Sequence, residues 1–380
     1  MRRGSEALAF TGILLVAAAC GSQQGGAGGP LPKGVTWAHH MGGAITSRPT
    51  VMGDKLLVAS ANGSLQMLSR KDGSVKWSYD ARTDAPEAAF HHRPVLVDGL
   101  ILNATEAKGS GHVYAFDASS GKVVWKHALG ADPNSGAGGS VTDVIQRDGH
   151  VYAIGLDGMM VCLDLKSGNK IWEAGPVETR IAPAAGPTYV YAAVGMTHMH
   201  GLDPMTGATA WDADLNAVVT TGLLAHGEEV YAGTSPFRMF RIDGKTGAVL
   251  VKMALQGKPV YNPIISNGAV SVFLRDANGI GDTANTIISL DAGLSKILWG
   301  RKAAGEWTSR NPQIYEDVVL AGDNAGELFA YGQADGMKKW SFKMNQGLGA
   351  IGTSDEMLYV GTLEGLVYAF QPPGKGSAGL

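Results

Sequence analysis

The sequence predicts an all-β protein in which eight four-stranded units close into a ring, that is, an eight-bladed β-propeller. Three observations predict it. A glycine followed four residues later by a tryptophan recurs along the 380-residue chain, with 39 to 48 residues between successive tryptophan positions. Apolar and polar residues alternate between the copies, as they do in strands. The 54 glycines are typical of a chain with many tight turns.

Five copies of the motif are intact and two are degenerate. In one degenerate copy, Val251 occupies the tryptophan position after Gly247. In the other, Ser295 occupies the glycine position before Trp299. Each copy is interpreted as a loop followed by the outer strand of one blade. The intact copies are Gly73–Trp77, Gly121–Trp125, Gly168–Trp172, Gly207–Trp211 and Gly336–Trp340.

The eighth blade is predicted to combine the two ends of the chain. Residues 364–373 begin a copy that stops before its tryptophan strand, whereas Trp37 lies in a strand with no preceding partner. Pairing these two segments completes the ring and removes its exposed edges. We therefore expect the propeller to cover residues 33–372, followed by a tail at 373–380.

The motif is predicted to serve folding. An aspartate before each loop can accept backbone N–H bonds, and the glycine supplies the positive φ that closes the loop. Each tryptophan is expected to bury its ring between neighbouring blades, contributing about 3–5 kcal/mol relative to alanine. The aspartates are Asp117, Asp164, Asp203, Asp243 and Asp291, and the structural tryptophans are Trp37, Trp77, Trp125, Trp172, Trp211, Trp299 and Trp340.

Residues 1–19 have the features of a secretory signal peptide. Arg2 and Arg3 precede an apolar run that is too short to span a bilayer as a mature helix. Cys20 follows small residues and resembles the acylated cysteine of a bacterial lipobox. Plain secretion and an uncleaved anchor are the alternatives.

Residues 20–32 are rich in glycine and are predicted to form a flexible tether after the lipidated Cys20. The residue after this cysteine is Gly21 and not the aspartate that retains such lipoproteins at the inner membrane. The resemblance to lipoproteins therefore implies the outer membrane, facing the periplasm. A net charge of −3 gives no reason to expect nucleic acid. Because a closed ring has no free edges, we expect a monomer within a larger complex.

The repeat Gly–x–Val/Leu–Tyr–Ala–Phe/Leu–Asp–x–x–x–Gly–Lys–x–x–Trp resembles that of pyrroloquinoline-quinone-type propellers over nearly all of residues 35–371. Two branches of that group are relevant. Resemblance to the quinoprotein dehydrogenases implies that the protein oxidises an alcohol or a sugar with a quinone and calcium. The lipoprotein outer-membrane assembly factors B imply a docking platform that holds the barrel-forming assembly protein.

The second branch matches this chain better in size, in lipobox and in blade number. A vicinal cysteine pair and a cluster of calcium ligands are missing from the sequence. Asp143, Asn262 and Asn311 are the few candidate ligands near the axis. We therefore predict a non-enzymatic scaffold with no cofactor, no metal and no catalytic residue, whose partner is the barrel assembly protein or another periplasmic client.

A set of cationic residues precedes the first strands of several blades. We call these segments the lead-in segments. If the ring forms, their arginines from blades 1, 2, 4 and 7 meet near one mouth of the axial channel, where guanidinium groups suit a partner's carboxylates or an anionic ligand. The alternative is that each arginine pairs with a local acid, such as Asp98, Glu178 or Glu316. The candidate residues are Arg48, His92, Arg93, Arg180 and Arg310.

The resemblance to the assembly factors also implies partner contacts in a basic loop before one blade and an acidic loop before the next. Residues 178–187 occupy the first place, although Arg180 is offset from the family's spacing. Residues 216–222 occupy the second place and lack the expected acids.

Two further residue types are candidate sites. His198 and His200 share one strand face, so the pair could chelate a transition metal. Aligning Asp203 with Asp117 instead gives His200 a packing position, which favours a structural role. Cys162 lies in an apolar run and is predicted to be a small buried hydrophobe.

Overall fold

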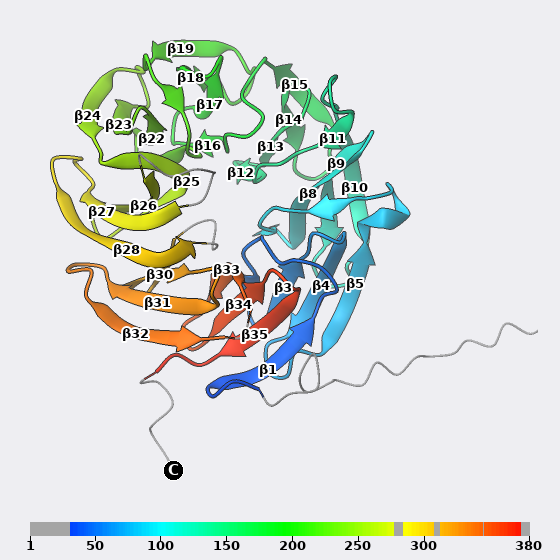
Figure 1. Cartoon of the computed structure of the whole chain (residues 1–380). Helices are drawn as coiled ribbons and strands as arrows, with labels where there is room; N and C mark the ends of the chain where they lie inside the picture. Colours follow the sequence, from blue (N-terminus) through cyan, green and yellow to red (C-terminus); the bar gives the residue numbers. More distant parts are fainter. Residues whose placement is uncertain (1–30, 277–283, 308–311, 345, 374–380) are drawn as a thin grey trace, which may run out of the picture.

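The computed structural model describes residues 31–276, 284–307, 312–344 and 346–373. In these residues, 35 strands form eight sheets arranged around a common axis (Figure 1). They also contain one short 3-10 helix. Each sheet contains at least four antiparallel strands. The predicted eight-bladed propeller is confirmed.

Blades 1 to 4 each run in chain order from the innermost to the outermost strand. Blade 1 is β2 (Thr50–Met52), β3 (Lys55–Ala59), β4 (Ser64–Ser69) and β5 (Val75–Asp80). Blade 2 is β7 (Val95–Val97), β8 (Leu100–Lys108), β9 (Gly111–Asp117) and β10 (Val123–Leu129). Blade 3 is β12 (Ile145–Arg147), β13 (His150–Ile154), β14 (Met160–Asp164) and β15 (Lys170–Ala174). Blade 4 is β16 (Ala184–Ala185), β17 (Val190–Val194), β18 (His198–Leu202) and β19 (Thr209–Asp214).

Blades 5 to 7 repeat this order, and blade 8 departs from it. Blade 5 is β21 (Leu224–His226), β22 (Glu229–Ser235), β23 (Arg238–Asp243) and β24 (Val249–Ala254). Blade 6 is β25 (Gly257–Ser266), β26 (Ala269–Asp276), β27 (Ala284–Asp291) and β28 (Ile297–Trp307). Blade 7 is β29 (Gln313–Tyr315), β30 (Val318–Gly322), β31 (Glu327–Gly332) and β32 (Lys338–Lys343). Blade 8 is β33 (Leu348–Thr353), β34 (Leu358–Thr362), β35 (Leu366–Phe370) and β1 (Val35–His40).

Two sheets carry extra strands. In blade 2, β6 (Ala89–Phe90) and β11 (Ala137–Gly139) pair with the far end of the long strand β8, and η1 (Ala81–Thr83) precedes β6. In blade 5, β20 (Val218–Val219) pairs with β22.

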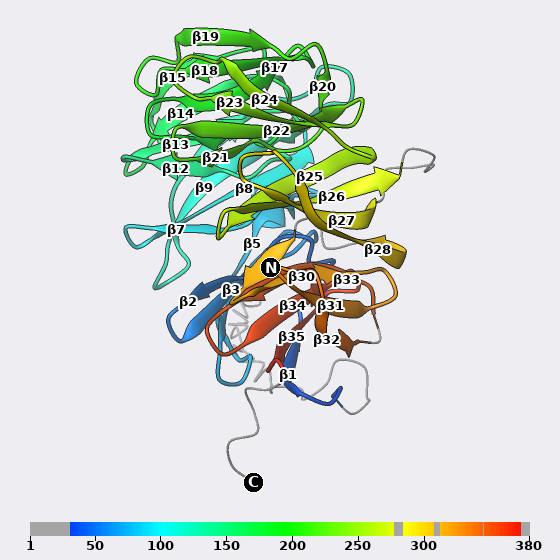
Figure 2. The ribbon, with the colours of Figure 1, turned by 90° about the vertical axis from the view of Figure 1, so that its left-hand side faces the viewer.

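The ring closes as the sequence predicts. Strand β1 pairs antiparallel with β35, with Trp37 opposite Ala369 and His40 opposite Leu366. The side view in Figure 2 likewise places β1 beside β35. Because the outer strand of blade 8 comes from the other end of the chain, the hydrogen bonds of this sheet hold the two ends of the propeller together.

The hairpin loops have the predicted chemistry. Asp117 Oδ1 accepts hydrogen bonds from the Ser120 backbone N–H at 2.8 Å and from the Ser119 hydroxyl at 2.6 Å. These bonds lower the pKa of Asp117 to about 2. Gly121 has a φ of +70° and closes the turn by donating its N–H to the Asp117 carbonyl oxygen at 2.8 Å.

Each motif glycine also contacts the tryptophan of the preceding blade. A Cβ on Gly168 would lie 2.5 Å from Cδ2 of Trp125, so the indole occupies the space that a side chain would need. Trp125 Nε1 donates to the Leu165 carbonyl oxygen of the same loop at 2.9 Å. The equivalent pairs are Trp37 with Gly73, Trp77 with Gly121, Trp172 with Gly207, Trp211 with Gly247 and Trp299 with Gly336.

The two degenerate copies of the motif meet at one interface. Blade 5 presents Val251 in place of tryptophan, and it packs on a cluster that includes Leu294 of blade 6. Leu294 is 2% exposed and has a φ of +53°, so it, and not Ser295, holds the left-handed conformation of this loop. At this interface, Val251 is smaller than the usual tryptophan, and Leu294 on the next blade is larger than the usual glycine.

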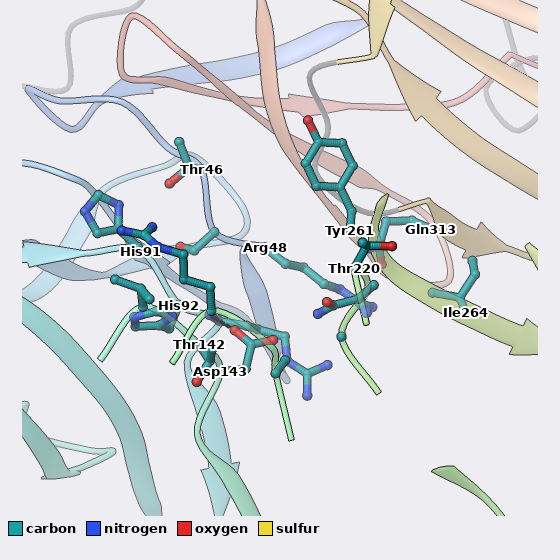
Figure 3. A pocket seen from close by; sticks show the side chains of 17 residues that line it. Thr46, Arg48, His91, His92, Thr142, Asp143, Thr220, Tyr261, Ile264 and Gln313 are labelled. Carbon is teal, nitrogen blue, oxygen red and sulfur yellow. Dashed lines mark hydrogen bonds between the residues drawn. The ribbon is translucent and has the colours of Figure 1, made fainter. Parts of the chain in front are cut away.

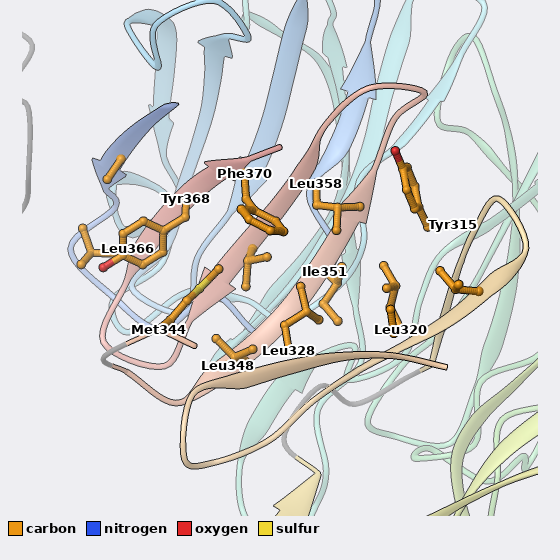
Figure 4. Packing of buried hydrophobic residues seen from close by; sticks show 14 residues of the cluster. Tyr315, Leu320, Leu328, Met344, Leu348, Ile351, Leu358, Leu366, Tyr368 and Phe370 are labelled. Atoms are coloured by element: carbon orange, nitrogen blue, oxygen red, sulfur yellow. The ribbon is translucent and has the colours of Figure 1, made fainter. Parts of the chain in front are cut away.

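Buried apolar side chains fill the spaces between neighbouring blades. Figure 4 shows the cluster between blades 7 and 8, where Leu328 and Met344 lie near Leu348 and Phe370. Trp340, on the outer strand of blade 7, packs against Phe370 of blade 8, with ring centroids 6.1 Å apart.

Candidate functional site at the channel mouth

A cavity of about 390 Å³ lies where the lead-in segments meet around the axis. Blades 1 to 7 all contribute residues to its lining. Its volume falls within the range of roughly 300–1,000 Å³ that is usual for small-ligand pockets. Arg48, Arg93 and Arg180, which the sequence predicts to converge, all line it.

The local sequence explains why these side chains reach the axis. In blades 1 and 2, a proline follows the arginine and begins the approach to the innermost strand. A proline suits this edge strand because it has no N–H to leave unpaired, and it keeps the preceding residue extended. The equivalent residues of blades 1 to 6 all line the cavity, and they are Arg48, Arg93, Asp143, Ala182, Gly222 and Asn262.

Arg180 reaches the cavity from a different position. Ala182, and not Arg180, is the blade 4 residue that precedes a proline, as Arg48 and Arg93 do in their blades. Arg180 therefore lies two residues before the position that the repeat predicts. It nevertheless lines the same cavity, and it is exposed to solvent. Arg310 and Cys20 lie outside the described residues, so both remain predictions.

The charges around Arg48 are not balanced. Its Nη2 donates to the Thr353 hydroxyl at 3.4 Å. Burial, followed by the positive charge of Arg93, lowers the pKa of Arg48, and Asp143 only partly offsets this. Asp143 Oδ1 already accepts a hydrogen bond from the backbone N–H of Arg93 at 3.1 Å.

In the part of the chain that the structure describes, the arginines of the cavity form no ion pair with the local acids. Glu178 Oε1 accepts instead from the backbone N–H of Met196 at 2.7 Å. Neither Arg93 nor Arg180 forms a side-chain ion pair with a described carboxylate. The alternative of local pairing is therefore not observed for the arginines of blades 1, 2 and 4.

The two histidines of blade 2 differ in environment. His92 is 2% exposed, and its Nε2 donates to the Ser140 carbonyl oxygen at 2.7 Å, so it joins two lead-in segments. His91 lines the cavity beside it, with its Nε2 3.7 Å from Glu106. Figure 3 shows both histidines on one side of the cavity and Tyr261 on the other.

Sequence reasoning missed Tyr261. This residue has a φ of +64°, which is uncommon for a bulky side chain, and its ring packs edge-on against Phe273 at 6.3 Å. Asn262, which follows it, was the only signal in this segment, because an amide near the axis is a possible ligand. The left-handed backbone could not be read from the residue type.

The other candidate residues lie away from the cavity. His198 Nδ1 lies 2.8 Å from Asp212 Oδ1, and His200 Nε2 lies 3.4 Å from the same oxygen, on the outer strands of blade 4. The Asp212 hydrogen bond raises the pKa of His198, whereas burial lowers that of His200. Cys162 is buried as predicted, and burial raises the pKa of its thiol to about 12.

A calcium–quinone centre does not fit this cavity. Calcium takes six to eight oxygen ligands, mainly carboxylates and carbonyls. The described lining offers one carboxylate, that of Asp143, and three guanidinium groups that would repel a cation. Nowhere in the described residues do three or more histidine, cysteine or acidic side chains form a group able to hold a metal ion.

The helical content of the described residues is limited to η1, so none of them forms a helix long and apolar enough to cross a membrane.

Among known protein families, the chain matches the one described as outer membrane protein assembly factor BamB. The matched residues are 29–193, 195–340 and 278–378. The chain belongs to this family. BamB of Yersinia pestis is 28% identical over 156 residues, which are 40% of this chain and 39% of that protein. BamB of Burkholderia pseudomallei is 23% identical over 98% of this chain and 99% of its own length.

The chain covers 34% to 62% of the length of the first four BamB relatives that it matches. Among solved structures, BamB from Moraxella catarrhalis superposes with a TM-score of 0.68 at 17% identity, over 89% of this chain and 99% of that one. This similarity concerns the fold. A polyvinylalcohol dehydrogenase of Sphingopyxis is also similar, 27% identical over 72% of this chain and 47% of its own length.

Proposed function

We propose that this protein is a lipid-anchored, periplasm-facing scaffold that binds other proteins during the assembly of outer-membrane β-barrel proteins. Membership of the BamB family, matched from residue 29 to residue 378, is the observation that carries the proposal. The relatives in Yersinia pestis and Burkholderia pseudomallei are named for outer-membrane protein assembly. The lipobox-like Cys20 and the glycine-rich tether supply the membrane attachment.

Partner recognition is proposed to occur where the blades differ in sequence. The repeated glycines and tryptophans hold neighbouring blades together, and the repeated aspartates close the hairpin loops. The lead-in segments vary from blade to blade, and Arg93 and Arg180 expose guanidinium groups at one mouth of the ring. Arginine is favoured at protein interfaces because it contacts carboxylates through two parallel hydrogen bonds.

Co-purification tests the partner. The full-length chain, tagged at its C-terminus, is crosslinked in cells and recovered from detergent-solubilised membranes. We expect the barrel-forming assembly protein in the eluate, identified by mass spectrometry. Cys20→Ala, which cannot be acylated, should release the chain to the soluble periplasmic fraction. An eluate without that assembly protein would contradict the proposed partner, and a Cys20→Ala chain that stays in the membrane would contradict the anchor.

The scaffold is proposed to be non-enzymatic, and the similarity to polyvinylalcohol dehydrogenase provides the competing function. The oxidoreductase alternative requires a calcium ion beside the quinone, and the three guanidinium groups of the lining oppose binding of that cation. Spectral titration of the protein with pyrroloquinoline quinone and Ca²⁺ separates the two. We expect no spectral change that depends on Ca²⁺, because the arginines of the lining repel the cation, and a one-to-one change that requires Ca²⁺ would favour the oxidoreductase.

A further inference from the structure

The cavity at the channel mouth has an excess of positive charge. Three guanidinium groups, from Arg48, Arg93 and Arg180, share its lining with one carboxylate, that of Asp143. With neutral histidines, this gives three positive charges against one negative charge, a net charge of +2. Because these residues come from blades 1 to 4, no single loop accounts for the excess.

The protein itself does not neutralise this charge within its described residues. The side chain of Arg48 donates to a neutral hydroxyl, that of Thr353, at 3.4 Å. Asp143 uses one oxygen to hold the backbone N–H of Arg93. Half-buried Arg48 also has a lowered pKa, which is the direction expected when a cation is desolvated beside another cation.

The rest of the lining combines an aromatic ring, an amide and hydroxyl groups. Tyr261 holds a left-handed backbone on the side of the cavity opposite His91 and His92 (Figure 3), and Asn262 and Ile264 of the same strand also line the cavity. Such backbone conformations are retained mainly where the surrounding structure enforces them, often at ligand sites. The Thr142 and Thr220 side chains add hydroxyl groups to the lining.

We propose that this cavity binds a ligand that carries at least two carboxylate groups, held by Arg48 and Arg93 with Arg180 at the mouth. Two carboxylates match the excess charge of the lining, and their planar pairs of oxygens suit the guanidinium fork. The carboxylates belong either to a small free polycarboxylate or to neighbouring acidic side chains of a peptide. This inference concerns a ligand and does not depend on the outer-membrane assembly role.

Isothermal titration calorimetry on the full-length, detergent-solubilised protein tests the site. The probes are propane-1,2,3-tricarboxylate, its neutral triamide, pyrophosphate and a peptide of six glutamates. We expect the tricarboxylate or the acidic peptide to bind with one-to-one stoichiometry, and the triamide not to bind. A dominant signal from the small acid identifies a free metabolite as the source, and one from the peptide identifies a protein segment.

Charge-neutral variants locate the binding. Arg48→Gln and Arg93→Gln should each lower the affinity at least tenfold for the probe that binds. The matched control is Arg82→Gln, because Arg82 is exposed and pairs with Asp80 outside the cavity. It should leave the affinity unchanged. No binding of either acid at millimolar concentration, tighter binding of pyrophosphate, or equal losses in the control would overturn the carboxylate site.

Thermal unfolding separates this role from a structural one. Without ligand, Arg48→Gln should keep or raise Tm, because it relieves the repulsion with Arg93. With the bound probe, the wild-type Tm should rise and the variant Tm should not. A lower Tm for Arg48→Gln together with unchanged affinity would show a structural role and contradict the proposal.

Discussion

Replacing Gly168 by alanine tests the contact that joins blade 2 to blade 3. Gly168 has a φ of +69°, and an alanine in this conformation costs about 1–2 kcal/mol. Its Cβ would also lie 2.5 Å from the Trp125 ring, and overpacking of this kind costs about 1–3 kcal/mol. We therefore expect the free energy of unfolding to fall by about 2–5 kcal/mol, the sum of the two costs.

Gly149→Ala is the matched control. Gly149 lies in the same blade with a φ of +78°, and a Cβ there would meet nothing within 4 Å, so only the conformational cost of about 1–2 kcal/mol applies. Trp125→Ala provides the second test. In that background the indole is gone, so Gly168→Ala should lower the free energy of unfolding only by the conformational cost. Urea unfolding followed by far-UV circular dichroism measures each variant. Equal losses for the two glycines, or no coupling to Trp125, would refute the reasoning.

Three further predictions concern individual sites. Val251→Trp should destabilise by about 1–3 kcal/mol and Leu294→Gly by about 2–5 kcal/mol, whereas the double variant should lose less than their sum in urea titrations. Additive losses would contradict the pairing of these two positions. His198 has its pKa raised by Asp212. The protonated His198 side chain therefore stabilises the folded protein fully at pH values below its pKa in the unfolded chain. This stabilisation is lost as the pH rises through its pKa in the folded protein. Asp212→Asn should lower that pKa in an NMR titration, and an unchanged value would contradict the ion pair. In a Cys20→Ala chain, the Cys162 thiol, with its pKa raised to about 12 by burial, should react with Ellman's reagent only on unfolding. A fast reaction of the native protein would show that the site opens.

The ring was predictable because its signals are local and repeated. Trp125 and Gly121 recur at near-constant spacing, and the unpaired strand of Trp37 could be matched only with the incomplete last copy. The contact between each glycine and the preceding blade could not be predicted in the same way, since spacing along the chain does not show which surfaces face each other. A signal did exist, because Val251 and Ser295 depart from the repeat in adjacent copies, and Leu294, beside Ser295, belongs to the cluster on which Val251 packs.

The site was predicted in part. Arg48 and Arg93 precede prolines at equivalent positions, so their convergence follows from the repeat. Arg180 reaches the same cavity from outside the pattern, which depends on the path of its own loop. His92 is a buried hydrogen-bond donor, and Tyr261 enters the site through an unusual backbone conformation. Both depend on tertiary packing that residue type alone does not reveal.

Site-specific photocrosslinking in cells tests the central claim most directly, namely that the channel mouth binds a protein of the outer-membrane assembly machinery. A photoreactive residue replaces Arg180 at the mouth or, as the control, exposed Asp148 in the turn that follows innermost strand β12. That turn lies at the end of the strand opposite its lead-in segment. The account predicts a crosslink from position 180 to the barrel-forming assembly protein and none from position 148. A crosslink from position 148 alone, or no crosslink from either position, would contradict it.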